Sequence, residues 1–477
     1  MRAVSDRSLK KACLAAAFVT ASRGEALAHA SERGHVLLLP THYYIAGGAL
    51  AVTVSFLVLA FLPPKPLEEL ARKRLPPLSL PSMGRVLASL LSFAIFACLV
   101  AAGFLGSRDP LSNPLPLVVW TLLWVGLTLA QGLFGNLWAW LNPWYGPWRL
   151  IMGLTGRGEA GAPFRLPKAF GYWPGAMLLF AFAWFELVYP APDDPARLAV
   201  ACVAYWLFSF AGMLFFGYED WTKRVEFLSV FFAMIARLSS FEVREEGGNR
   251  TLSLCLPGAK AAGSDPLPPS GVAFLLLALS SVSFDGFMRT FTWLGLIGIN
   301  PLEFPGRSAV VLPNSLGLLV MFAALGAVFL FAVAVGDGLV KRRAGLAASA
   351  GLLVWSIVPI SMAYHFSHYL TALLVNSQYA LAALSDPLSN GWNLFGTAGF
   401  HVRAGVALGA QSAWMIWNAQ AAAIIGGHVL AVIIAHVIAC RIHGSQRDAM
   451  ISQIPLAALM VGYTVFGLWL LSSPTAG

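Results

Sequence analysis

Long apolar stretches that alternate with short polar loops constrain this chain more than any other feature. The stretches are about 18–24 residues long, which is the length an α-helix needs to cross about 30 Å of hydrocarbon. Of the 477 residues, 58% are hydrophobic and 11% are charged, whereas soluble proteins carry about 25% charged residues. A single soluble core cannot hold that much apolar surface. The sequence therefore predicts an all-α polytopic membrane protein with roughly ten transmembrane helices.

The apolar stretches and the charges between them place the expected spans. They run over about 44–62, 86–105, 117–138, 173–188, 198–216, a stretch from 271 that ends before 300, 316–335, 346–368 with a further apolar piece to 383, 412–437 and 454–471. Between 239 and 270, the sequences FEVRE, EGGN and RTLSLCL predict a small β-hairpin, followed by a linker rich in Pro and Gly. This insert separates a first membrane helix group at 44–238 from a second group at 271–477.

Basic residues gather in alternate loops. Lys and Arg are concentrated in the loops after the first, third, fifth, seventh and ninth expected spans. The positive-inside rule then predicts a cytoplasmic hairpin, and a periplasmic N-terminus and C-terminus, in a bacterial inner membrane. These loops also account for the net charge of +9. We therefore expect the lipid bilayer, and not a nucleic acid, as the partner of the basic residues.

The N-terminus has the pattern of a secretory signal peptide at 1–28, with a basic start, a short apolar segment and Ala-x-Ala sites. Cleavage after Ala28 would leave a periplasmic segment at 29–43 that begins with His29. A free amine and its own imidazole form a compact chelate for copper or zinc. Cleavage after Ala30 would remove that chelate, so both outcomes stay open.

Further along the periplasmic segment lies His35, which with His29 flanks a short polar stretch, SERG. Both residues precede the first expected span, and we expect them as metal ligands over the outer mouth of a site in the membrane. The alternative is that they are scattered surface histidines without a ligand.

Two histidines, His365 and His368, stand three positions apart in an expected span and so share one side of a helix. An imidazole in hydrocarbon requires a partner, which makes an intramembrane histidine a candidate for function. This spacing allows both rings to reach one divalent metal ion, for which copper or zinc is favoured. The alternative is a pair of interfacial histidines that hydrogen-bond to Tyr364 and Tyr369.

A carboxylate, Asp285, lies about 14 residues into its expected span, where it needs a cation, a metal or a proton. We expect it to act as a ligand or as a general base that holds a water molecule; the alternative is an ion pair with Arg289, four residues on. His428 lies near the middle of a later span and is expected to join His365 and His368, as a third ligand with a part in catalysis. A b-type haem between helices is another use of such histidines.

The segments around these residues resemble one family of membrane proteins. They are SSVSFDGF at 280–287, SMAYHFSHYLTALLVNSQY at 361–379, LSDPLSNGWNLFGTA at 384–398 and GGHVLAVIIAHV at 426–437. These segments are similar to those of the fenitrothion hydrolases, which are membrane-bound organophosphorus hydrolases. The resemblance covers most of the chain after the N-terminal segment and is strongest from about 280 to 436.

The resemblance implies hydrolysis of a small apolar organophosphorus triester. The bond between phosphorus and the aryl oxygen would be cleaved, to give 3-methyl-4-nitrophenol and dimethyl thiophosphate. A metal held by His365 and His368, with His428 or Asp285 as a third ligand, would activate the attacking water. No GxSxG or paired HxH motif accompanies these residues. A copper-handling or metal-transport protein and a haem-bearing electron carrier stay open as alternatives.

Overall fold

The structure is a computed structural model of the chain. It describes residues 41–61, 69, 73–74, 78–80, 84–156, 162–246, 249–340, 345–403, 405 and 409–475. The predicted signal peptide and the predicted ligands His29 and His35 lie outside the described residues.

Within the described residues, nine helical segments are long and apolar enough to cross a membrane. They are α3 (Thr41–Phe61), α5 (Arg85–Leu105), Pro114–Phe134 (α6, η1 and α7), α11 (Pro195–Phe216), α15 (Pro269–Met288), Arg307–Gly338 (η5 and α17), Leu346–Ser385 (α18, η6 and α19), Gln411–His443 (within α20, Ala410–His443) and α21 (Gln446–Ser472). The tenth expected span is α10 (Trp173–Leu187), an apolar helix of 15 residues. The prediction of an all-α polytopic membrane protein is confirmed, with one of the ten expected spans shorter than the others.

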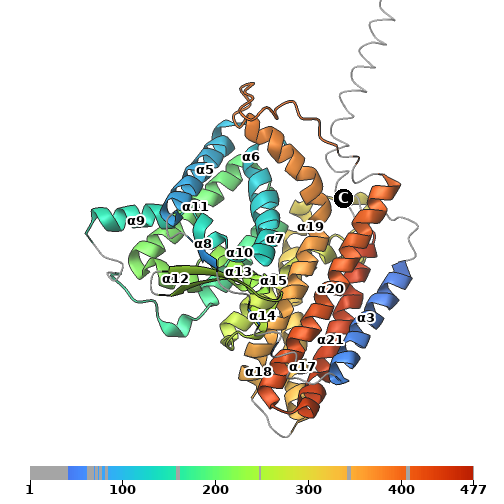
Figure 1. Cartoon of the computed structure of the whole chain (residues 1–477). Helices are drawn as coiled ribbons and strands as arrows, with labels where there is room; N and C mark the ends of the chain where they lie inside the picture. Colours follow the sequence, from blue (N-terminus) through green and yellow to red (C-terminus); the bar gives the residue numbers. More distant parts are fainter. Residues whose placement is uncertain are drawn as a thin grey trace, which may run out of the picture.

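Shorter helices connect these segments. They include α8 (Trp138–Leu141), α9 (Tyr145–Leu154), α12 (Tyr218–Arg224), α13 (Phe227–Ile235), η3 (Ala236–Leu238), α14 (Ala259–Ala262) and α16 (Phe291–Leu296). The apolar helix α13 packs against α7, α8, α10 and α19, and most of its side chains are buried. It therefore belongs to the core of the bundle (Figure 1).

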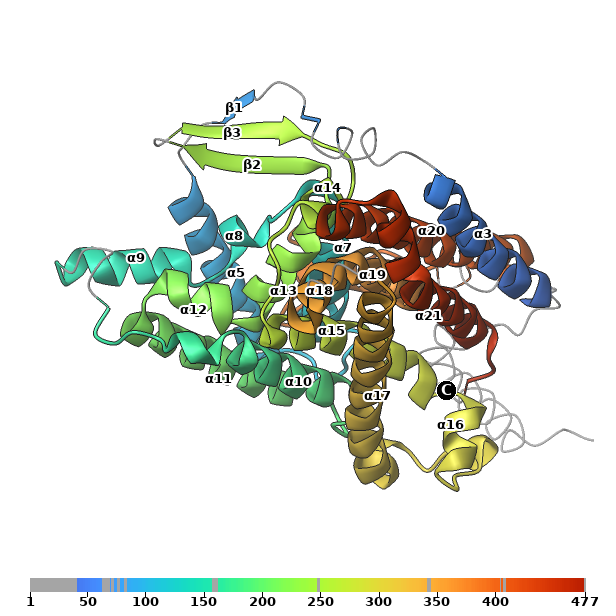
Figure 2. The same ribbon diagram turned by 90° about the horizontal axis from the view of Figure 1, so that it is seen from below.

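The first helix, α3, lies beside the last two, α20 and α21 (Figures 1 and 2). The Tyr44 hydroxyl donates to Oδ1 of Asn418 at 3.1 Å, and Nε2 of Gln446 donates to the carbonyl oxygen of Ala60 at 3.0 Å. A Cβ at Gly48 would lie 2.6 Å from the Leu468 side chain, so the helices approach closely where no side chain intervenes. Segments from the two ends of the chain are thus side by side.

The insert forms the expected hairpin. Strands β2 (Phe241–Glu246) and β3 (Asn249–Leu254) are antiparallel, with Phe241 opposite Leu254. A third strand, β1 (Leu78–Leu80), pairs with the other edge of β3, which gives the order β1-β3-β2 (Figure 2). The hairpin prediction is confirmed, whereas β1 was missed because three residues between prolines are too short for a recognisable pattern.

A lysine on α14 ties the hairpin to the helices. The Lys260 ammonium donates to Oγ of Ser239 at 2.7 Å and to the carbonyl oxygen of Phe241 at 2.5 Å. Burial lowers the pKa of Lys260 to about 8. Most of the ammonium form is therefore still present at neutral pH, and it makes both bonds.

The helix that carries the histidine pair is longer than the sequence analysis expected. The main span was expected to end near residue 368, but α19 (Ile357–Ser385) continues without a break to Ser385. No Gly or Pro occurs between 360 and 385, so nothing interrupts the backbone hydrogen bonds. The helix ends where Pro387 disfavours a helical conformation at Asp386. His365 and His368 therefore lie in the first half of one long helix.

Among the helices of the first half of the chain, the buried carboxylate of Glu226 forms the N-cap of α13. It accepts hydrogen bonds from the backbone N–H of Leu228 at 3.0 Å and of Ser229 at 2.8 Å. The Tyr205 hydroxyl and, at 3.4 Å, Nε1 of Trp138 donate to the same carboxylate. Four donors match the acceptor positions of a carboxyl group's two oxygens, so this group holds α8, α11 and α13 together.

We expect the substitution Glu226→Gln to lower the free energy of unfolding by about 1–3 kcal/mol, because an amide nitrogen would face donors that then lack an acceptor. The matched control is Glu219→Gln on α12, whose side chain is 66% exposed and pairs with Lys223; we expect it to cost under about 0.5 kcal/mol. Thermal unfolding of the detergent-solubilised protein measures both. Equal shifts for the two variants would contradict the anchoring role.

Candidate functional site

A cavity of about 910 Å³ opens among the helix ends that lie away from the hairpin. Residues from η1 (Leu117–Leu127), α10, α15, α19, α20 and α21 line it. Helix α15 begins at Pro269, after the hairpin, and reaches the cavity at Asp285, about 24 Å further along its axis. The volume falls in the range of small-molecule pockets, about 300–1,000 Å³.

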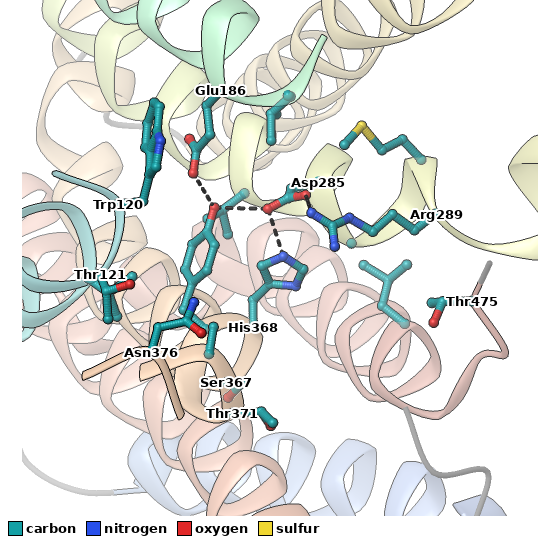
Figure 3. Close-up of a pocket in the computed structure, with 18 of the residues that line it drawn as sticks. Trp120, Thr121, Glu186, Asp285, Arg289, Ser367, His368, Thr371, Asn376 and Thr475 are labelled. Atoms are coloured by element: carbon teal, nitrogen blue, oxygen red, sulfur yellow. Dashed lines mark hydrogen bonds and ion pairs between the residues drawn. The ribbon is translucent and has the colours of Figure 1, made fainter. Parts of the chain in front are cut away.

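Asp285 is the centre of the polar contacts in this cavity, and it is 1% exposed. Its Oδ2 lies 2.7 Å from Nε2 of His368 and accepts a hydrogen bond from the Tyr369 hydroxyl at 2.9 Å. Its Oδ1 lies 3.5 Å from Nη2 of Arg289 (Figure 3). The predicted ion pair with Arg289 is thus present, and an imidazole and a phenol share the same carboxylate.

The bond to Asp285 determines which nitrogen of His368 is available. A carboxylate accepts and does not donate, so Nε2 carries the proton, and a neutral ring then has its lone pair on Nδ1. Nδ1 lies beside α15 at Gly286, where an added Cβ would be 3.7 Å away. The side chain of His368 is 25% exposed, and both residues line the cavity. Nδ1 of His368 therefore lies next to space that a ligand can enter.

A second carboxyl group, Glu186, reaches the same cluster from α10. Its Oε1 lies 2.9 Å from the Tyr369 hydroxyl oxygen, which bridges Glu186 and Asp285 (Figure 3). Nη1 of Arg307 donates to the backbone oxygen of Glu186 at 2.8 Å and so fixes the end of α10. Glu186 was not predicted as a site residue from the sequence. Its position inside AFAWFELV is nevertheless a signal, because a carboxyl group near the end of an apolar helix needs a partner.

His365 makes a different contact from His368. Its Nε2 lies 2.9 Å from the carbonyl oxygen of Trp124, which is on η1, a π-helical stretch. The centroid of its ring lies 5.2 Å from that of Trp124, edge-on, and 4.9 Å from that of Tyr369. The centroid of the His368 ring lies 4.7 Å from that of the same tyrosine. The two histidines thus flank Tyr369. His365 is 3% exposed and packs against the tyrosine ring while it bonds to the Trp124 carbonyl.

His428 lies outside the cavity lining and is fully buried. Its Nδ1 is 2.8 Å from the carbonyl oxygen of Ile424, one turn earlier in α20. Its Nε2 has no hydrogen-bond partner among the described residues. The centroid of its ring lies 6.1 Å from that of Tyr364 and 6.3 Å from that of Tyr463. The structure therefore does not bring His428 into contact with Asp285.

The predicted metal ligands do not converge in the described part of the chain. His368 and Asp285 contact each other, while His365 and His428 hydrogen-bond to separate backbone carbonyls. No group of three or more His, Cys, Asp or Glu side chains that could hold a metal ion occurs among the described residues. The described residues therefore do not form the predicted metal site with three ligands. The bound copper or zinc ion stays a prediction, and the reaction proposed for the cavity does not use a metal ion.

Comparisons with protein-family models, with characterised proteins and with solved structures found no match for this chain. The resemblance to the fenitrothion hydrolases stays a prediction. The geometry of the Asp285–His368 pair and its cavity therefore carries the functional argument.

We expect diethyl pyrocarbonate, which acylates accessible imidazole nitrogens, to modify His368 much faster than His365 or His428. The reason is that only His368 of these three lines the cavity. The variant Gly286→Ala should slow the modification of His368, because its methyl group would lie against Nδ1. Peptide mass spectrometry measures each site, with the exposed His401 as the internal control. Modification of His365 or His428 at the rate of His368 would contradict this site geometry.

Proposed function

We propose that this chain is a membrane-bound hydrolase of small apolar organophosphorus triesters of the fenitrothion type. The observation that carries the proposal is the 2.7 Å contact between Asp285 and His368 at the edge of a cavity inside an apolar bundle. A histidine held by a buried carboxylate is the arrangement that hydrolases use to take a proton from a nucleophile.

In the proposed reaction, Nδ1 of His368 takes a proton from a water molecule as the water oxygen attacks phosphorus. The bond between phosphorus and the aryl oxygen then breaks, and the electron pair leaves with the aryl oxide. The products are a nitrophenolate and a dialkyl thiophosphate. Asp285 keeps the ring in one orientation and stabilises the imidazolium that forms.

The charges around the cavity suit a phosphorus centre. Arg289 and Arg307 both line it, and guanidinium groups bind phosphoryl oxygens and anionic products through paired N–H donors. Trp120, Ile416 and Leu470 supply apolar walls. An apolar triester dissolves in the bilayer, so we propose that it enters the cavity from the membrane.

We also propose in which membrane the chain lies and on which side of it the cavity is found. The basic loops support an inner membrane of bacterial type, with a cytoplasmic hairpin and a periplasmic N-terminus and C-terminus. The cavity lies at the helix ends away from the hairpin, so we propose that it lies toward the periplasmic side of the membrane.

A copper or zinc ion is the alternative activator of the water. Metal-bound histidines commonly donate their other N–H to a carboxylate, as His368 does to Asp285. Of the other predicted ligands that lie among the described residues, His365 and His428 bond to backbone carbonyls, and Asp285 contacts the other ring nitrogen of His368. This is why we propose the imidazole itself as the base.

We expect His368→Gln and Asp285→Asn each to slow the release of nitrophenolate from a dialkyl nitrophenyl thiophosphate by about 10²–10⁴-fold. His368→Gln removes the base. Asp285→Asn removes the carboxylate that orients the base and stabilises its protonated form. His401→Gln, on an exposed loop, is the matched control and should keep the wild-type rate. The assay uses the purified full chain in proteoliposomes and follows the absorbance of nitrophenolate.

Two outcomes would count against the proposal. If the wild-type chain releases nitrophenolate no faster than His368→Gln, the chain is not this hydrolase. If a chelator abolishes hydrolysis and zinc or copper restores it, the water is activated by a metal ion and not by the imidazole.

A further inference from the structure

The Tyr369 hydroxyl lies between two carboxyl groups, with Oδ2 of Asp285 and Oε1 of Glu186 each 2.9 Å from its oxygen (Figure 3). A phenol has one O–H and can donate only one of these two hydrogen bonds. The other short contact is a full hydrogen bond only if a carboxyl group donates to the phenol oxygen. A proton on one of the two carboxyl groups would satisfy both contacts.

The surrounding charges decide which carboxyl group that is. Asp285 accepts a hydrogen bond from His368 and has the Arg289 guanidinium beside its Oδ1, so its negative charge is compensated. Arg307 donates to the backbone oxygen of Glu186 and not to its carboxyl group. The charged and titratable groups that face Glu186 are Asp285 on α15, Arg289 at the C-cap of α15, Tyr369 on α19 and Arg307 on η5 (Arg307–Val310). The nearby negative charge of Asp285 favours a neutral Glu186.

We propose that Glu186 holds this proton and is the proton donor of the site, while His368 is its base. Glu186 lines the cavity, as His368 does, so both can reach one bound molecule from the two sides of Tyr369. The phenol then donates to Asp285 and accepts from Glu186, and both contacts are satisfied. Two groups in one site with opposite protonation states are the arrangement of a general acid and a general base.

The role of the donor in turnover rests on the hydrolase function proposed above. As the bond between phosphorus and the aryl oxygen breaks, the O–H bond of Glu186 breaks and a new O–H bond forms on the leaving oxygen. His368 meanwhile keeps the proton from the attacking water. Solvent in the cavity later takes that proton from the imidazolium and returns one to the Glu186 carboxylate. The site should therefore accept triesters of plain phenols, which leave poorly without a proton, as well as nitrophenyl esters.

Infrared difference spectroscopy tests the proton on Glu186 without any substrate. Full-length wild type and Glu186→Gln are compared in lipid at neutral pH, with Glu219→Gln, an exposed glutamate, as the matched control. We expect Glu186→Gln to lose a carbonyl stretch of a protonated carboxylic acid, and Glu219→Gln to lose only carboxylate bands. The variant Tyr369→Phe keeps Glu186 and should shift that carbonyl stretch, because the phenol that accepts its proton is gone. Loss of carboxylate bands alone in Glu186→Gln, or an unchanged carbonyl stretch in Tyr369→Phe, would overturn the assignment.

A series of aryl leaving groups tests the donor role. We expect Glu186→Gln to slow the cleavage of phenyl esters by about 10²-fold and that of nitrophenyl esters by under about 3-fold, since only the poorer leaving group needs the acid. An equal loss on both esters would show a structural effect and overturn the donor role. If the wild type cleaves neither ester, the hydrolase proposal fails, while the infrared result still decides whether Glu186 is protonated.

Discussion

A carboxylate buried in an apolar bundle is the constraint on which the site depends. An isolated carboxylate is costly to remove from water, so Asp285 requires hydrogen bonds and positive charge around it. His368, Tyr369 and Arg289 supply them. The contact that compensates the charge also fixes the His368 ring and leaves its lone pair on Nδ1. The same bond thus serves the stability of the bundle and the chemistry of the site.

The polar groups of the site come together because three helices, α10, α15 and α19, reach the cavity at suitable points along their lengths. Helix α15 passes from the hairpin side to the cavity and carries Asp285, and Arg289 at its C-cap lies one turn further along. Helix α19 is unbroken, so its histidines and Tyr369 keep a rigid spacing. Helix α10 ends beside them and contributes Glu186. Asp285 itself is 1% exposed, and its burial strengthens the electrostatic contacts that it makes.

The spans, the hairpin and the Asp285–Arg289 pair could be predicted because each is a local pattern of spacing or hydrophobicity. The partners of the histidines could not. Residues three apart on a helix differ by about 60° in direction, which in α19 sends His365 to the Trp124 carbonyl and His368 to Asp285. Contacts between helices, such as that of Glu186 with Tyr369, join residues 183 positions apart. No periodicity in the sequence encodes them, although each polar group alone could be recognised as needing a partner.

The rate of the double variant Asp285→Asn/His368→Gln tests the central claim most directly, because it measures whether the two residues act as a unit. If Asp285 acts only through His368, the double variant should release nitrophenolate no more slowly than His368→Gln alone. A double variant whose loss is the product of the two single losses would show that the residues act independently, and would contradict the role of Asp285 as the group that orients and stabilises His368.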